Sequence, residues 1–176
     1  MIFDLRAILL FGSNVILLFL TLLVNSALSS YSIYMLLLGP MLVFPALYLG
    51  HRHYFICILC TGLWCDSALP SPYGLFTILF LISGACIFQL RVRFRAEQNY
   101  HPILLSHSVN FFFIIIVSIM MSSANLLSAG FWLHFFVITI TSHLMLLVVA
   151  PWFFNFERML FSLFHLDSEP EDYPTL

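Results

Sequence analysis

The sequence has 176 residues, of which 62% are hydrophobic and 8% are charged, with a formal net charge of −2 and a mean hydropathy of +1.04. Soluble globular domains carry about 25% charged residues, so this composition excludes a soluble protein and a basic nucleic-acid-binding surface, and it predicts an integral membrane protein. Four cysteines lie in apolar runs, which is not the pattern of a secreted disulfide framework: Cys57, Cys60, Cys65 and Cys86.

The predicted fold is an all-α bundle of six transmembrane helices. A span needs about 20 apolar residues, and polar and turn-forming clusters separate the apolar runs of this length. The predicted spans are Ala7–Leu28, Tyr31–Leu49, Tyr54–Leu69, Tyr73–Leu90, Ile103–Ala124 and Phe131–Phe154. The first is expected to be a retained span rather than a cleaved signal peptide. Gly39, Pro40 and Pro45 are expected to kink or shorten the second, and the third is a short span or a re-entrant segment.

The arginines predict the orientation of these spans. With six spans, every arginine falls on the same side of the membrane, and the loops on the other side contain no Lys or Arg. These residues are Arg6, Arg52, Arg91, Arg93, Arg95 and Arg158. The positive-inside rule then places both termini in the cytoplasm (N-in/C-in).

Residues 1–155 are predicted to form the transmembrane domain. Two further regions are expected to follow it. Residues 156–166 are predicted to form a helix along the cytoplasmic interface, with Glu157, Arg158 and other polar residues on one side and apolar residues on the other. Residues 167–176, "DSEPEDYPTL", are acidic and are predicted to be disordered.

The segment "GLWCDSALPSPYG", Gly62–Gly74, contains the one carboxylate within a predicted span, Asp66. An unpaired charge at the centre of a span costs about 2.5–3.5 kcal/mol on insertion scales, so this residue is a candidate functional group. Its place beside a turn with Pro70 and Pro72 leaves three roles open: capping that fixes the loop, pairing at an interface, or proton or ion handling. A second carboxylate is missing from the spans, which excludes paired-carboxylate chemistry within one chain.

Histidines supply two further candidate groups. In "HRHYFICILC", His51 and His53 precede Cys57 and Cys60, but the cysteines run into the apolar segment, so an interfacial loop is expected rather than a zinc site. His107, Asn110 and His143 lie within predicted spans, where they either hydrogen-bond across helices or line a ligand or proton path.

Enzyme chemistry is not expected. No serine lies in a G-x-S-x-G turn, no nucleophile–base pair can be nominated, and a glycine-rich nucleotide loop is absent, so no cofactor is predicted. The basic loop Arg91–Pro102, which carries Arg91, Arg93 and Arg95, is interpreted as a topology anchor on anionic membrane lipids or as a docking site for a cytoplasmic partner.

Two segments resemble the rod shape-determining protein MreD family. The family has a G-x-x-x-D segment, a short turn and a glycine that opens the next span, which this chain matches as "GLWCD", "SALPSPY" and Gly74. The segment Ala150–Phe161, with Pro151 and Trp152, is similar to the last span of the family. The resemblance covers roughly Pro40–Phe161, and it departs from the family in the prolines of the turn and in the acidic tail.

The resemblance implies a non-enzymatic scaffold subunit in the bacterial inner membrane. Such a protein binds an MreC-like single-span protein and, through it, the MreB filament, a RodA-type glycosyltransferase and its penicillin-binding partner, and it regulates peptidoglycan synthesis and cell shape. The bundle of the family is also similar to the S components of energy-coupling-factor vitamin transporters. The alternative is therefore an S-component-like subunit that binds a small molecule, with His107, Asn110 and His143 lining the pocket.

Overall fold

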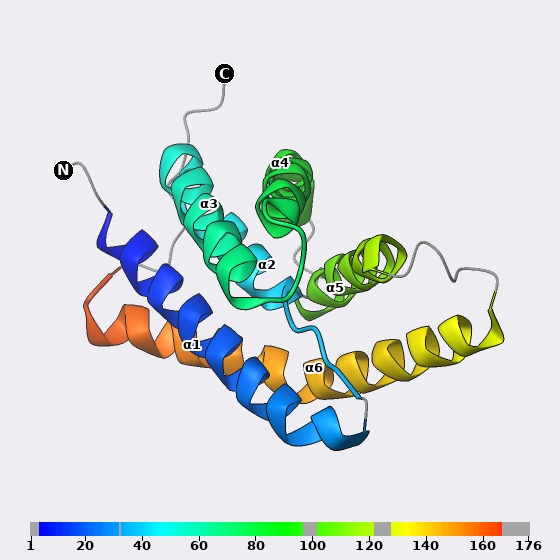
Figure 1. Cartoon of the computed structure of the whole chain (residues 1–176). Coiled ribbons are helices and arrows are strands. Elements are labelled where there is room, and N and C mark those ends of the chain that lie inside the picture. The colour runs from blue at the N-terminus through cyan, green and yellow to red at the C-terminus, as the bar shows by residue number, and fades with distance from the viewer. Residues whose placement is uncertain (1–3, 32, 97–101, 122–127, 167–176) are drawn as a thin grey trace.

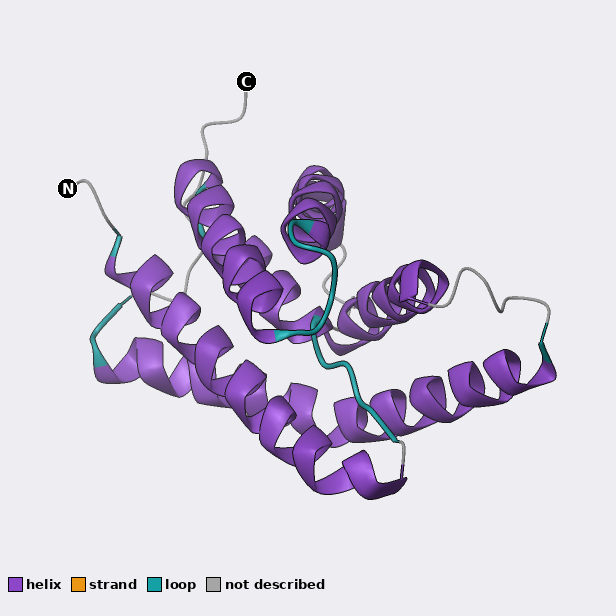
Figure 2. Ribbon diagram, in the orientation of Figure 1, coloured by secondary structure: helices purple, strands orange, loops and turns teal. Residues whose placement is uncertain are grey.

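The computed structural model describes residues 4–31, 33–96, 102–121 and 128–166. These residues form helices, turns and one extended stretch, and they contain no β-strand (Figure 2). The helices are α1 (Leu5–Leu28), a 3₁₀ turn at Ser29–Tyr31, α2 (Gly39–Tyr48), α3 (His51–Ala68), α4 (Leu75–Ala96), α5 (Pro102–Met121) and α6 (Ala129–Leu163).

Three of these segments are long and apolar enough to cross a membrane, as expected of an all-helical membrane protein. They are α1 with its 3₁₀ turn (Leu5–Tyr31), α5 and α6, whereas α2 and the Leu75–Gln89 part of α4 are shorter apolar helices. At a rise of about 1.5 Å per residue, the ten-residue α2 is much shorter than a bilayer core. The six-span topology therefore stays a prediction.

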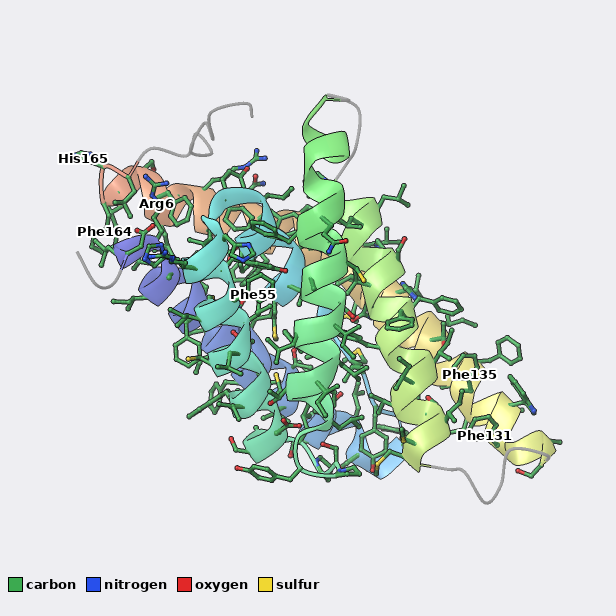
Figure 3. The ribbon with its side chains drawn as sticks, turned by 90° about the horizontal axis from the view of Figure 1, so that it is seen from above. Arg6, Phe55, Phe131, Phe135, Phe164 and His165 are labelled. Carbon is green, nitrogen blue, oxygen red and sulfur yellow. The ribbon has the colours of Figure 1, made fainter. Side chains whose placement is uncertain are left out.

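α3 and α4 are an antiparallel pair that packs on α2, and α1 packs mainly on α3 (Figure 1). α5 packs on α2 and α6, and α1 and α6 cross one another. Seen from above, Arg6 lies at the same end of the molecule as Phe164 and His165, and Phe131 and Phe135 lie at the opposite end (Figure 3). The first turn of α1 and the last turn of α6 thus share one end of the bundle.

One face of α1 is buried and holds it against α2 and α3. Asp4 caps the helix by accepting a hydrogen bond from the backbone amide of Arg6 at 3.0 Å. The buried residues recur at helical spacing: Ala7, Leu10, Ser13, Asn14, Leu17, Leu18 and Thr21. The amide of Asn14 donates to the carbonyl of Met41 and to the hydroxyl of Thr61, both at 3.1 Å, and so ties three helices together.

The predicted span Tyr31–Leu49 is helical only in its second part. Residues 33–38, called the extended stretch below, have no regular secondary structure, and α2 begins at the Gly39–Pro40 pair. The reason is local: proline suits the first turn of a helix because it has no N–H to leave unpaired. Pro45 lies inside α2 without ending it.

Two helices extend further than expected. α4 continues to Ala96, so Arg91, Arg93 and Arg95 belong to its last turns and not to a loop. Basic residues suit the C-terminal end of a helix because of its dipole. The rest of the predicted loop, residues 97–101, and the tail at 167–176 lie outside the described residues.

The predicted interfacial helix at residues 156–166 is not a separate element, because α6 runs without a break from Ala129 to Leu163. Of its predicted polar side, Arg158, Ser162 and His165 are exposed, but Glu157 is not. Glu157 is fully buried and Phe161 is 1% exposed, whereas Met159 and Leu163 are 58% and 68% exposed. Continuing the helix past Pro151 turns Glu157 towards the bundle, next to the buried Phe153, Phe154 and Phe161.

Candidate functional site

Asp66 joins the end of α3 to the start of α4. Its side chain is 4% exposed, and its carboxylate accepts hydrogen bonds from the backbone amides of Phe76 (2.8 Å) and Thr77 (3.0 Å) and from the Thr77 hydroxyl (2.5 Å). The two amides belong to the first turn of α4, where helical N–H groups have no intrahelical partner and where the helix dipole favours a negative charge. Asp66 therefore caps α4 from the neighbouring helix, and its oxygens are occupied by these donors.

Two glycines make this geometry possible. A Cβ atom on Gly62 would lie 2.7 Å from the Cα atom of Thr77, closer than real Cβ contacts allow, so only glycine lets α3 approach α4 this closely. Gly74 has a φ of 89°, a conformation that side chains with a Cβ atom rarely adopt. The backbone can thus turn directly into α4, and Asp66 can reach the first backbone amides of α4.

The turn between these helices contains Pro70 and Pro72. The amide of Ser71 donates to the carbonyl of Leu69 at 2.9 Å, and the amide of Leu75 donates to the carbonyl of Pro72 at 3.2 Å. The capping that the sequence allows for Asp66 is present, but the donors come from α4 and not from this turn. We refer below to Gly62, Asp66 and Gly74 together as the α3–α4 corner.

Asn110 holds the extended stretch that precedes α2. Its side-chain oxygen accepts from the amides of Leu38 (2.9 Å) and Gly39 (3.3 Å), and its nitrogen donates to the carbonyl of Leu36 at 2.8 Å. A Cβ atom on Gly39 would overlap the backbone carbonyl of Ser106, so α5 passes directly against this stretch. Asn110 is fully buried, and it replaces the backbone partners that a helix would have supplied.

Two more side chains complete the partners of the extended stretch. Asn25 of α1 exchanges two hydrogen bonds with Met35, accepting from its amide at 2.8 Å and donating to its carbonyl at 2.9 Å. The hydroxyl of Ser142 on α6 accepts from the amide of Leu36 at 3.0 Å. Three helices, α1, α5 and α6, thus each supply a polar group to the same piece of non-helical backbone.

His107 and His143 meet between α5 and α6. Their Nδ1 atoms are 2.8 Å apart and their rings are stacked, with centroids 5.1 Å apart. One Nδ1 must therefore carry a hydrogen and donate the hydrogen bond, and the other must accept that hydrogen bond. The Nε2 atom of His107 is buried and has no hydrogen-bond partner among the described residues. These predicted interior residues thus connect helices, and they do not surround the cavity described below.

Glu157 was not identified as a candidate from the sequence. Both of its carboxyl oxygens are buried, and neither has a hydrogen-bond partner among the described residues. Its neighbours on α6, Phe154 and Phe161, pack on Phe44 of α2, with ring centroids 5.6 and 5.9 Å apart. The available signal was the apolar run on both sides of Glu157, with Phe153 and Phe154 before it and Phe161 after it at helical spacing.

The remaining predicted residues do not gather at one site. Pro151 lies inside α6, and Trp152 is 53% exposed and stacks on Phe156. Cys57 is buried and Cys60 is exposed, and within the described ranges no three His, Cys, Asp or Glu side chains are grouped as metal ligands would be. A cavity of about 600 Å³ lies at the end of the bundle that holds Phe131 and Phe135.

The α3–α4 corner and the polar partners of the extended stretch are thus the two organised arrangements of the predicted residues. No family model, no curated protein and no solved structure matches this chain.

Proposed function

We propose that this chain is a non-enzymatic scaffold subunit of the bacterial elongation (rod) complex, located in the inner membrane with both termini in the cytoplasm. In this role it binds an MreC-like single-span protein and, through it, the MreB filament, a RodA-type glycosyltransferase and its penicillin-binding partner. It thereby regulates peptidoglycan synthesis and cell shape.

The observation that carries the proposal is the α3–α4 corner. The residues that carry the resemblance to the MreD family, Gly62, Asp66 and Gly74, act together in this structure as a single device that sets the angle and spacing of two helices. Because the oxygens of Asp66 are occupied by donors of α4, the residue suits a rigid binding surface better than catalysis.

Two helices offer surfaces for a single-span partner. Much of α1 and α6 is apolar and exposed in the described chain, for example Phe19 on α1 and Val148 on α6. Helices associate in a bilayer through close packing and interhelical hydrogen bonds, because lipid tails are as apolar as their side chains. A transmembrane helix is therefore a suitable partner for either surface.

The test is affinity purification of the full chain from native membranes with an MreC-like single-span protein as the expected partner. Asp66→Ala is expected to weaken this association and to round rod-shaped cells, because it releases the first turn of α4. The matched control is Asp4→Ala, which removes the cap of α1 but leaves the α3–α4 corner intact. Normal cell shape after clean depletion of the protein would rule the proposal out.

The alternative, an S-component-like subunit that binds a vitamin, is favoured by one observation, the 600 Å³ cavity. Pockets for small molecules are about 300–1,000 Å³. The residues that first suggested this function, however, do not line the cavity, since Asn110 holds the extended stretch and His107 contacts His143. Tight vitamin binding by the purified protein that is lost in His134→Ala, at a residue that lines the cavity, would favour the transporter subunit over the scaffold.

A further inference from the structure

The cavity lies between α1, α5, α6 and the turn of the α3–α4 corner, close to Phe131 and Phe135 (Figure 3). Most of its lining is aliphatic or aromatic, and no Asp, Glu, Lys or Arg among the described residues borders it. Apolar lining side chains include Leu22, Leu36, Phe76, Ile114, Val117 and Ile138. An ion or a strongly charged metabolite would find no counter-charge there, so the lining selects an uncharged and largely apolar ligand.

The wall of the cavity contains non-helical backbone, which is an independent indication of a binding site. Met35 and Leu36 of the extended stretch border the cavity, and their amides are bonded to the side chains of Asn25 and Ser142. In a membrane protein, non-helical backbone is tolerated only where it is buried in protein or lines a cavity, and interrupted helices mark the ligand sites of many transporters. Three side chains maintain this interruption, so it is a built feature of the fold.

A few polar groups border the cavity and could orient a ligand. The hydroxyl oxygen of Ser71 is buried and has no hydrogen-bond partner among the described residues. It comes from the turn between α3 and α4, and Ser26, Ser118 and His134 also line the cavity. A buried hydroxyl without a partner costs free energy, so a ligand group that bonds to Ser71 would be stabilised there.

We propose that this cavity binds a membrane lipid with an uncharged, hydroxyl- or ester-bearing head group. The head group bonds to the hydroxyl of Ser71, and one acyl chain lies against Leu36, Ile114 and Ile138. Phe76 connects this site to the α3–α4 corner, because its side chain lines the cavity while its amide donates to Asp66. The inference does not depend on the rod complex, since it concerns a ligand of this chain alone.

The experiment is photo-crosslinking of the purified full chain with a monoacylglycerol that carries a diazirine on its acyl chain. Labelled positions are mapped by mass spectrometry of peptides. Labelling is expected on α5 and α6 near Ile114 and Ile138, and unlabelled monoacylglycerol is expected to compete it away. Val117→Trp, which fills the cavity from α5, should lose most of this labelling. The control is Ile119→Trp on the same helix, because Ile119 does not line the cavity and is 45% exposed.

Three results would overturn the proposal. They are labelling spread evenly over the exposed faces of α1 and α6, equal labelling of the two tryptophan variants, and displacement of the probe by a water-soluble vitamin and not by monoacylglycerol. If Val117→Trp does not fold, Ser71→Ala tests the same site with a smaller change. In Ser71→Ala, unlabelled monoacylglycerol should compete less well with the probe, whereas a hydrocarbon of equal chain length should compete almost as before. An equal effect on both competitors would also refute the assignment.

Discussion

The carboxylate of Asp66 accepts a 2.8 Å hydrogen bond from the backbone amide of Phe76, ten residues along the chain, and so caps a helix to which it does not belong. Most N-caps lie at the start of their own helix, as Asp4 does in α1. Capping from the neighbouring helix makes the cap depend on the packing of α3 against α4.

Replacing Asp66 by alanine should destabilise the protein by about 1.5–3 kcal/mol, the range for hydrogen bonds to a charged group. The amides of Phe76 and Thr77 and the Thr77 hydroxyl would lose their acceptor in a buried place. Thermal unfolding in detergent measures the effect. Asp66→Asn, which keeps one side-chain acceptor, should lose less stability than Asp66→Ala. An alanine variant as stable as the parent protein would contradict the role of the cap.

Replacing Gly62 by alanine should move α3 away from α4, because the new Cβ atom would lie 2.7 Å from the Cα atom of Thr77, and backbone at that place cannot yield as a flexible side chain can. We expect a loss of stability of about 1–3 kcal/mol, typical of overpacking. Gly12→Ala in α1 is the matched control, since nothing lies within 4 Å of its Cβ position. The control should be neutral or stabilising by up to about 1 kcal/mol, because alanine favours helix more than glycine does.

Replacing Asn110 by leucine should be among the most damaging changes of similar size in the bundle. The amides of Leu38 and Gly39 and the carbonyl of Leu36 would be left unpaired in an apolar interior, at about 1–3 kcal/mol for each buried group. Unfolding in detergent and the yield of folded protein are the measurements. Ser108→Ala, which removes an exposed hydroxyl bonded only within α5, should have little effect.

Replacing Glu157 by glutamine should leave stability unchanged or raise it. A buried carboxyl group without a hydrogen-bond partner contributes desolvation cost and no compensating bond among the described residues. The exposed neighbouring position supplies the control, Arg158→Gln, with an expected change of less than about 0.5 kcal/mol. Clear destabilisation of Glu157→Gln alone would mean that the carboxylate has a bonding partner in the folded protein.

Several local features could be predicted because they depend on short-range chemistry. A Gly–Pro pair in the second apolar run predicted a shortened helix, and α2 indeed begins there. For Asp66, a lone acid beside a proline-containing turn, capping was one of three predicted roles, and it is the role seen in the structure. For Asn110, hydrogen bonding between segments of the bundle was one of two predicted roles, and the structure shows these bonds. In each case the residue type limits the bonds that it can make.

Other features could not be predicted because the sequence pattern is ambiguous. The sequence around Glu157 does not show which side of the helix faces the bundle. In the structure, Phe153, Phe154 and Phe161 are buried, and Glu157 lies on the same side as these residues. The polar residues Glu157 and Arg158 predict that the sixth span ends at Phe154, yet α6 continues to Leu163. Burial of an acid depends on neighbours that are distant in the sequence.

The low charge content and the long apolar runs of the sequence predicted a helical membrane protein, and the all-helical fold with three helices long and apolar enough to cross a bilayer agrees with that prediction. It also indicated that the second apolar run is interrupted near Gly39 and Pro40 and that Gly74 opens the next helix, because proline restricts φ and glycine releases it within a single residue. Only the tertiary structure decided which groups meet. The bond of Asp66 to α4, the contact of His107 with His143 and the cavity beside Leu36 all join separate helices, and their distances follow from the packing of the whole bundle.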